Sequence, residues 1–262
     1  MRKKLIVSGC SFTTKDYKSA SYPEMNCDWS KWPELLAEKL DMDCVNLAFS
    51  GAGNHFIFQT IMDTIIRTPR DEIGMVIAAW SQANREDWQY YKDTLKNKMM
   101  YNETLMKGFV WHNDRLNKRG DVFSWVRSDI IRMITLQKLC EALDIPFKQL
   151  QMVNLFDGYI SGLVKEDYTR HKYSGDQKED RKKCNAILLE YEDYINKDNF
   201  LGWPGNERMG GLPFCSLVDE HLQIGEHDPH PNKLGHEKIA KEIYGRLGQR
   251  IFKTQTRIPR PF

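Results

Sequence analysis

Two segments near opposite ends of the 262-residue chain carry the side chains of a hydroxyl nucleophile and its base. Ser11 follows a short β-branched run, and Asp228 and His230 stand in an Asp-Pro-His-Pro segment. A serine hydroxyl is a weak nucleophile until a base takes its proton, and an imidazole oriented by a carboxylate can serve as that base. These residues therefore predict attack by Ser11 on an acyl carbon, with His230 as the base and Asp228 orienting it.

Amide groups on other segments could stabilise the negative charge that such an attack creates on the substrate oxygen. The candidate donors are the backbone N–H groups of Ser11 and Gly51 and the side chains of Gln82 and Asn54. Donors of this kind act at about 2.7–3.1 Å, and the loss of one lowers the rate by about 10²–10³. We expect an oxyanion hole made of the N–H groups of Ser11 and Gly51 and the side chain of Gln82, with Asn54 or Asn84 as the alternative side-chain donor.

The order of these segments resembles that of the SGNH (GDSL-like) hydrolases. In that family a Gly-Asp-Ser block follows the first strand and an Asp-x-x-His-Pro block precedes the last helix. Residues 9–11 read Gly-Cys-Ser, with cysteine in place of aspartate, and Asp228 lies two residues before His230 instead of three. Gly51 matches the family's glycine block, and Gln82 stands where the family has asparagine. The resemblance implies a serine hydrolase of carbohydrate, lipid or small-metabolite esters, including O-acetyl esters, with no cofactor or metal.

Apolar runs that alternate with amphipathic segments predict an α/β protein. Strands are expected at residues 3–8, 44–48, 74–80 and 145–153, and helices at residues 32–40, 57–66, 126–143 and 232–252. This order predicts a flavodoxin-like, doubly wound parallel sheet in three α/β/α layers. Ligands bind such sheets beyond the carboxyl ends of the strands, where Ser11, Gly51 and Gln82 are expected to lie.

The whole chain, residues 1–262, is expected to form one domain with two insertions. The insertions span about residues 85–125 and 160–215, and long stretches of this kind are usually functional. We expect them to form the walls or a lid of the pocket. Five of the seven tryptophans fall outside the expected sheet and are interpreted as aromatic walls of the site: Trp29, Trp32, Trp88, Trp111 and Trp203.

Composition narrows the classes of partner. The formal net charge is +2, from 38 Lys and Arg against 36 Asp and Glu, which argues against a nucleic-acid partner and favours a neutral substrate.

No apolar stretch approaches the roughly 20 residues that span a bilayer, and the run before Cys10 is too short for a secretory leader. The six cysteines show no paired spacing and suit free thiols. We therefore expect a soluble, cytoplasmic protein.

Other chemistries remain open at the same segments. Cys10 could attack as a thiolate in place of Ser11. A metal could be bound by the imidazoles and carboxylate of His221, His227, Asp228, His230 and His236, although their spacing matches no familiar metal motif. We expect His236 to lie on the surface of the final helix. Residues 50–54 could bind a phosphate, but they lack the Lys-Ser/Thr ending of a phosphate-binding loop.

Two other functions fit the same segments. An acyltransferase would use the same acyl-enzyme and pass the acyl group to an alcohol. A binding or scaffold protein would retain the fold without catalysis, and the altered blocks at Cys10 and Gln82 favour it, whereas the Asp228 and His230 segment opposes it.

Overall fold

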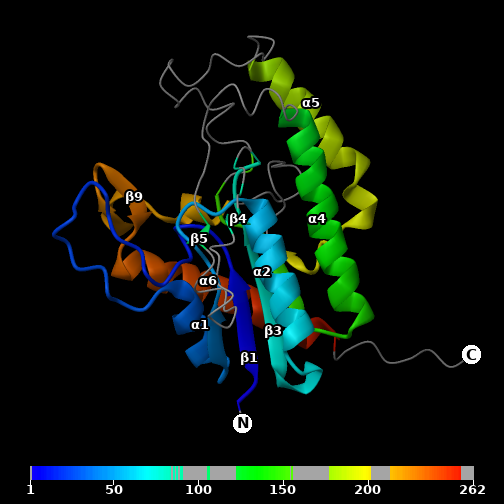
Figure 1. The fold of residues 1–262 in the computed structure, drawn as a ribbon, viewed down its shortest axis with the longest axis horizontal. Helices are drawn as coiled ribbons and strands as arrows, with labels where there is room; N and C mark the ends of the chain where they lie inside the picture. The colour runs from blue at the N-terminus through cyan, green and yellow to red at the C-terminus, as the bar shows by residue number, and fades with distance from the viewer. Residues whose placement is uncertain are drawn as a thin grey trace, which may run out of the picture.

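A parallel sheet forms the centre of the molecule. The computed structural model describes residues 2–83, 85, 87, 89–90, 105–106, 122–153, 155, 177–201 and 213–254. Within them the sheet has five strands in the order β2-β1-β3-β6-β7 (Figure 1). The strands are β1 (Lys4–Ser8), β2 (Asp43–Asn46), β3 (Ile73–Trp80), β6 (Phe147–Gln151) and β7 (Phe200–Leu201). Counted within the sheet the order is 2-1-3-4-5, so the predicted flavodoxin-like α/β fold is confirmed.

Helices cover both faces of this sheet and give three layers (Figure 1). The helices are α1 (Trp32–Lys39) and α6 (Lys233–Thr254) on one face, and α2 (Asn54–Arg67), α4 (Val122–Ala142) and α5 (Gln177–Glu190) on the other. Successive residues of a strand point to opposite faces. Leu5 and Val7 accordingly pack in the core against α1 and α6, and Ile6 packs in the core against α2 and α4.

The two strongest sequence patterns, an apolar run and a long amphipathic segment, correspond to β3 and α4 in the structure. The uninterrupted apolar run at residues 74–80 lies in β3, where every residue except Met75 is buried, as expected for a strand covered on both faces. The stripe that predicted the longest internal helix is fully buried on α4 at Val126, Ile130, Met133, Leu136 and Cys140, but its last member, Leu143, lies beyond the end of the helix and is exposed. Because all five strands are parallel, the loops after β1, β2 and β3 leave the same edge of the sheet.

Two sequence predictions about α1 and α6 are wrong. His236, expected on the surface, is only 2% exposed, and Trp32, expected in the wall of a pocket, is fully buried in the core. The cause is that α6 packs along α1, which places His236 Nδ1 3.3 Å from the backbone N–H of Trp32. The imidazole therefore accepts a hydrogen bond from the first turn of α1, where helical N–H groups lack partners of their own. Burial lowers the pKa of His236 to about 3, which keeps it neutral.

Several short elements were not predicted. An antiparallel hairpin, β8 (Gln223–Gly225) and β9 (Asp228–Pro231), precedes α6, and a second one joins β4 (Gln89–Tyr90) to β5 (Leu105–Met106). Strands of two to four residues carry little periodicity, and the prolines of β9 argue against a strand. The short 3-10 turns are η1 (Arg70–Glu72), η4 (Glu192–Tyr194), η6 (Phe214–Leu217) and η7 (Glu220–Leu222).

The expected insertions at about 85–125 and 160–215 fall largely outside the described residues, and so do Trp88, Trp111 and Trp203. Their assignment to the walls or lid of a pocket stays a prediction. Among the helices of the described ranges, none combines the length and apolar character needed to cross a membrane.

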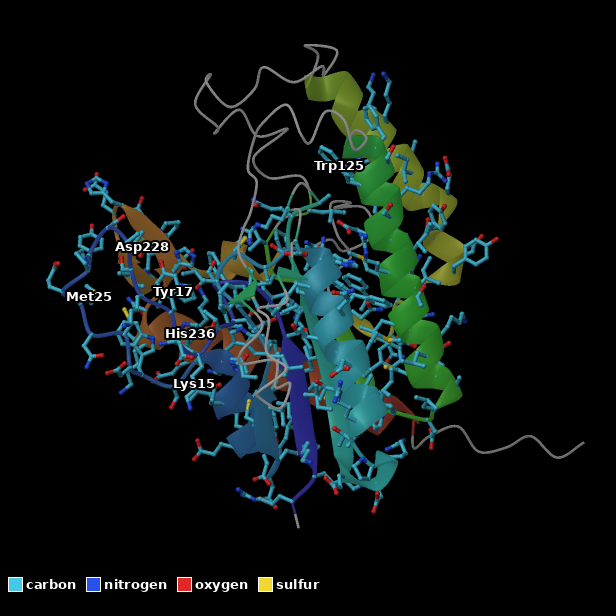
Figure 2. The ribbon with its side chains drawn as sticks, in the orientation of Figure 1. Lys15, Tyr17, Met25, Trp125, Asp228 and His236 are labelled. Carbon is cyan, nitrogen blue, oxygen red and sulfur yellow. The ribbon has the colours of Figure 1, made fainter. Side chains whose placement is uncertain are left out.

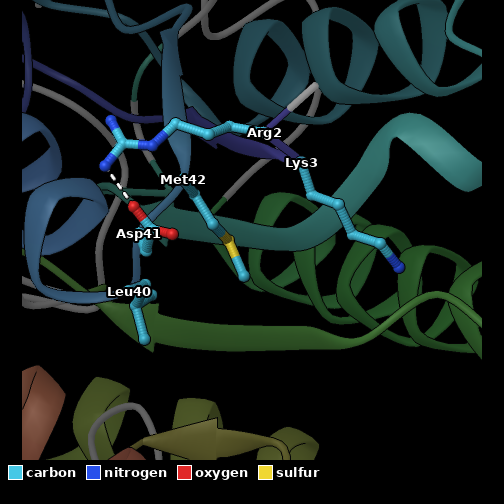
Figure 3. Close-up of a pocket in the computed structure, with 5 residues that line it drawn as sticks. All are labelled: Arg2, Lys3, Leu40, Asp41 and Met42. Atoms are coloured by element: carbon cyan, nitrogen blue, oxygen red, sulfur yellow. Dashed lines mark hydrogen bonds and ion pairs between the residues drawn. The ribbon is translucent and has the colours of Figure 1, made fainter.

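A hollow of about 490 Å³ lies at the amino end of the sheet. It is lined by Arg2, Lys3, Leu40, Asp41 and Met42, and an ion pair joins Arg2 to Asp41 (Figure 3). The strand β1 begins beside this hollow and ends three residues before Ser11. The hollow is therefore at the opposite end of the sheet from the predicted catalytic segments.

Candidate active site

Ser11 lies in a tight turn directly beyond β1. The carbonyl of Cys10 accepts hydrogen bonds from the backbone N–H groups of Thr13 (2.8 Å) and Thr14 (3.0 Å). A side chain at Gly9 would place its Cβ 2.5 Å from Thr13 Oγ1, so the turn requires glycine there. Ser11 is partly exposed on this turn, whereas Cys10 is fully buried in the core. Burial in the core disfavours Cys10 as an alternative nucleophile; all six cysteines are free thiols.

The three predicted catalytic side chains meet. The distance between His230 Nε2 and Ser11 Oγ is 2.7 Å, and that between His230 Nδ1 and Asp228 Oδ1 is 2.6 Å. Asp228 and His230 are two positions apart in β9, and strand periodicity places both side chains on one side of the strand. Asp228 Oδ1 also accepts the backbone N–H of His230 at 3.1 Å, which ties the carboxylate to its own strand.

Tyr17 is a functional candidate that the sequence analysis missed. Its hydroxyl donates to Asp228 Oδ2 at 2.8 Å and lies 2.8 Å from His230 Nδ1, and Figure 2 shows Tyr17 beside Asp228. The rings of Tyr17 and Phe12 also lie against the imidazole, with centroids 4.3 and 4.7 Å from that of His230. The only sequence signal was an aromatic residue in the polar loop after β1.

The hydrogen-bond network determines which ring nitrogen of His230 carries the proton. Tyr17 has one hydroxyl proton and gives it to Asp228 Oδ2, so both groups that face Nδ1, Asp228 Oδ1 and the Tyr17 oxygen, are acceptors. Nδ1 must therefore carry the hydrogen. In a neutral imidazole Nε2 then has a free lone pair, and it faces the Ser11 hydroxyl.

The electrostatic surroundings favour this neutral imidazole. Burial lowers the pKa of His230 below its ordinary value of 6.5, the positive charge of Arg85 lowers it further, and Asp228 only partly opposes them. Burial alone would raise the pKa of Asp228, but hydrogen bonds from Ser19, His230 and Tyr17 outweigh it and lower the pKa overall. At neutral pH the pair is thus an ionised carboxylate and an uncharged base.

The backbone donors lie in two loops that are joined to each other. The N–H of Phe49 donates to the carbonyl of Gly9 at 3.1 Å, which fastens the loop after β2 to the loop after β1. Gly51 has a φ of 83°, in a turn that the N–H of Ala52 closes onto the carbonyl of Phe49 at 3.0 Å. No described residue accepts a hydrogen bond from the backbone N–H of Ser11 or Gly51. Within the described residues, neither N–H group has a partner that would compete with an oxyanion.

The two predicted side-chain donors differ. Gln82 is 7% exposed, its Oε1 accepts a hydrogen bond from Arg85, and none of the described residues accepts one from its Nε2. Asn54 is 1% exposed, and its Nδ2 donates to the carbonyl of Ser81 at 3.1 Å and to Asp129 at 2.7 Å. Both amide hydrogens of Asn54 are thereby used. Of the two predicted side-chain donors, only Gln82 thus has an amide nitrogen without an acceptor among the described residues, and its place in an oxyanion hole stays a prediction.

Asp87 holds the segment after Gln82 against the start of α2. Its carboxylate accepts the backbone N–H groups of Gly53 at 2.7 Å and Phe56 at 2.8 Å, which lack partners within the helix. This cap explains why α2 begins at Asn54, three residues before the predicted start. The cap comes from 31 to 34 positions away in the sequence, so local pattern gave no signal for it.

No group of three or more His, Cys, Asp or Glu side chains is arranged to hold a metal ion in the part of the chain that the structure describes. Instead, His230 contacts Asp228, Ser11 and Tyr17, and Asp228 also accepts a hydrogen bond from Tyr17.

Comparison with known proteins gives structural matches only. No protein-family model matches the chain, and no curated protein matches its sequence. Among solved structures, the esterase EstA from Pseudoalteromonas sp. is 14% identical, with a TM-score of 0.48 over 95% of this chain and 98% of that one. An acetylxylan esterase from Geobacillus stearothermophilus is 14% identical, with a TM-score of 0.44 over 94% of each chain.

A third structure is that of a G-D-S-L family protein from Desulfitobacterium hafniense, described as lipolytic. It is 12% identical to this chain, with a TM-score of 0.48 over 93% of this chain and 99% of that one. The structures similar to this chain over nearly its full length thus include G-D-S-L lipolytic proteins and esterases, at low sequence identity.

Proposed function

We propose that the protein is a serine hydrolase of esters, with Ser11 as nucleophile, His230 as general base and acid, and Asp228 as the carboxylate that orients His230. The observation that carries this proposal is the pair of short contacts on the imidazole. Nε2 lies 2.7 Å from Ser11 Oγ, and Nδ1 lies 2.6 Å from Asp228 Oδ1. This geometry lets one ring accept the serine proton while the other side of the ring is held by a carboxylate.

The proposed reaction has two halves. Ser11 Oγ bonds to the ester carbonyl carbon while its proton moves to His230 Nε2, and the N–H groups of Ser11 and Gly51 and the Gln82 amide hold the oxyanion. The ester C–O bond then breaks, and Nε2 returns the proton to the departing alkoxide. A water molecule repeats the sequence on the acyl-enzyme, which releases the acid and restores Ser11. The nucleophile, base and donors all belong to this chain, so the reaction needs no cofactor.

The proposed substrate is an O-acyl or O-acetyl ester of a carbohydrate, a lipid or a small metabolite. This class follows the resemblance of the sequence blocks to SGNH hydrolases. The near-balanced charge of the chain fits an uncharged ester better than a polyanion.

Labelling with a fluorophosphonate, together with hydrolysis of p-nitrophenyl acetate, tests the proposal. We expect the wild-type protein to be labelled on Ser11, as located by mass spectrometry, and to release free acid. Ser11→Ala and His230→Ala should lose labelling and turnover. Ser30→Ala, at an exposed serine just before α1, is the matched control and should retain both. A folded wild-type protein that is neither labelled nor active would contradict the proposal and favour a binding protein.

A further inference from the structure

The hydroxyl of Tyr17 makes two contacts within the Asp228–His230 pair that the reaction itself does not require. It donates to Asp228 Oδ2 and lies at the same distance, 2.8 Å, from His230 Nδ1. The aromatic ring also lies against the imidazole, with the two planes inclined by 30°. One side chain therefore contacts both the acid and the base, on the side of the imidazole away from Ser11.

Asp228 and His230 are only two positions apart, and this short spacing explains why the contacts from Tyr17 matter for the orientation of both side chains. Asp228 Oδ1 is used locally, by the backbone N–H and by Nδ1 of a residue only two positions away. The rotation of the carboxylate and the tilt of the imidazole are then decided by what holds Oδ2 and the ring face. Tyr17 holds Oδ2 and lies against the ring face, and Ser19 adds a further hydrogen bond to the carboxylate.

The loop that carries Tyr17 is fastened to the hairpin β8–β9, which carries the pair. Ser21 Oγ donates to the carbonyl of His227 at 2.8 Å, and the Tyr22 ring lies so close to Gly225 that a Cβ there would be 2.7 Å from it. Tyr17 is thus held in place by the same hairpin that it contacts.

We propose that Tyr17 is a positioning residue that holds the Asp228 carboxylate and the His230 ring in the arrangement that aims Nε2 at Ser11. The inference rests on the proposed function for its kinetic consequence, whereas the geometric role does not depend on activity. Burial and the neighbouring Asp228 raise the pKa of Tyr17, so its hydroxyl keeps its proton and remains a donor at neutral pH, where the base is neutral.

Tyr17→Phe distinguishes the contribution of the hydroxyl from that of the ring. Phenylalanine retains the ring contact with His230 and lacks the hydroxyl that contacts Asp228 and His230. Hydrogen bonds to charged groups are strong, and we expect kcat to fall by about 10- to 100-fold with KM changed by less than about twofold. Tyr17→Leu also removes the ring contact and should lose more. Tyr22→Phe is the matched control: it removes a hydroxyl from the same loop, one that accepts the backbone N–H of His227 at 3.4 Å, and should retain wild-type kcat.

The nitrogen chemical shifts of the His230 imidazole, read by NMR through its carbon-bound protons, provide a second measurement. Loss of the Tyr17 oxygen leaves Nδ1–H with Asp228 as its single acceptor, so the Nδ1 shift should move in Tyr17→Phe and remain unchanged in Tyr22→Phe. Unchanged shifts in folded Tyr17→Phe would overturn the inference, as would wild-type kcat in an active enzyme. A wild-type protein without activity would contradict the proposed function alone, because the shifts still test Tyr17.

Discussion

The guanidinium of Arg85 donates from Nε to the Oε1 of Gln82 across 3.1 Å, and this bond decides which end of the Gln82 amide is free. The oxygen of a primary amide accepts and its nitrogen donates, so fixing the oxygen on Arg85 turns Nε2 away from it. Arg85 is itself held, since it also donates to the carbonyl of Ala52 at 3.3 Å. Gln82 therefore presents a donor at the edge of the sheet where Ser11 lies, although its side chain is one methylene longer than asparagine.

Gln82→Ala tests this assignment. If Nε2 stabilises the oxyanion, its removal should lower kcat by about 10²–10³ while KM changes little, because the donor acts mainly in the transition state. Steady-state kinetics with p-nitrophenyl acetate measures the effect. Gln82→Glu, which replaces the donor by a negative charge, should be at least as impaired. Wild-type turnover in Gln82→Ala would remove Gln82 from the oxyanion hole.

The pH dependence of kcat/KM should report the ionisation of His230. Protonated imidazole cannot accept the Ser11 proton, so activity is lost as the pH falls through the pKa of His230. Burial and Arg85 lower that pKa from 6.5, and the midpoint of the acid limb should therefore lie below pH 6.5, with full activity at neutral pH. Circular dichroism at each pH controls for unfolding. A midpoint above pH 6.5 would show that the Asp228 contact outweighs burial.

Asp129 should make stability depend on pH in the opposite sense to most carboxylates. It is 3% exposed, bonded to Asn54 and Arg132, and burial raises its pKa from 3.8 to about 7. Between these values the folded state binds more protons than the unfolded state, so this group's contribution to the free energy of unfolding falls as the pH rises. Asp129→Asn cannot ionise, and its stability relative to the wild-type protein should improve from about pH 4 to about pH 7.

Urea denaturation at a series of pH values measures that difference. Asp71→Asn, at an exposed carboxyl, is the control and should show no comparable trend. A stability difference between Asp129→Asn and wild type that stays constant with pH would contradict the raised pKa of Asp129.

Gly9→Ala should damage both the fold and the site. The new Cβ would lie 2.5 Å from Thr13 Oγ1 and 2.7 Å from Thr13 Cβ, within the turn that holds Ser11. We expect a loss of about 1–3 kcal/mol in the free energy of unfolding, as for other overpacked positions, together with slower fluorophosphonate labelling. Gly245→Ala is a matched control in α6, where the added Cβ would meet no atom within 4 Å beyond its chain neighbours and the local helix backbone, and it should gain up to about 1 kcal/mol. Equal stability of both variants would contradict this account of the turn.

The sequence was sufficient for the parallel core and for the placement of the catalytic candidates at one edge of the sheet. The short apolar runs of β1 and β3, which alternate along the chain with amphipathic helices, leave few other folds, and topology then places the loops after β1, β2 and β3 together. For His236 a usable signal existed. His236 falls three positions before Ile239 and seven before Ile243, on the buried stripe of α6. Helical periodicity therefore predicted burial, whereas the polarity of the side chain suggested the surface.

Other features depend on distant pairs that no local pattern encodes. Asn54 is occupied by Asp129, which lies 75 positions away on α4, and Asp228 is held by Tyr17, which lies 211 positions away in an irregular loop. A loop without periodicity gives no direction for its side chains. Such contacts are decided only when the layers pack, so the sequence predicted the residue types of the site better than the surroundings that hold them.

The 219 positions that separate Ser11 from His230 make the proposed site depend on almost the whole chain. Joining them closes almost the entire chain into one loop, whose entropic cost is met only after the sheet and the hairpin have formed. While the chain is being synthesised, its first half carries a serine with no base beside it and is chemically inert. On the proposed function, hydrolysis requires the carboxyl-terminal segment to lie against the loop after β1, so turnover is evidence that these two distant parts of the chain have packed together.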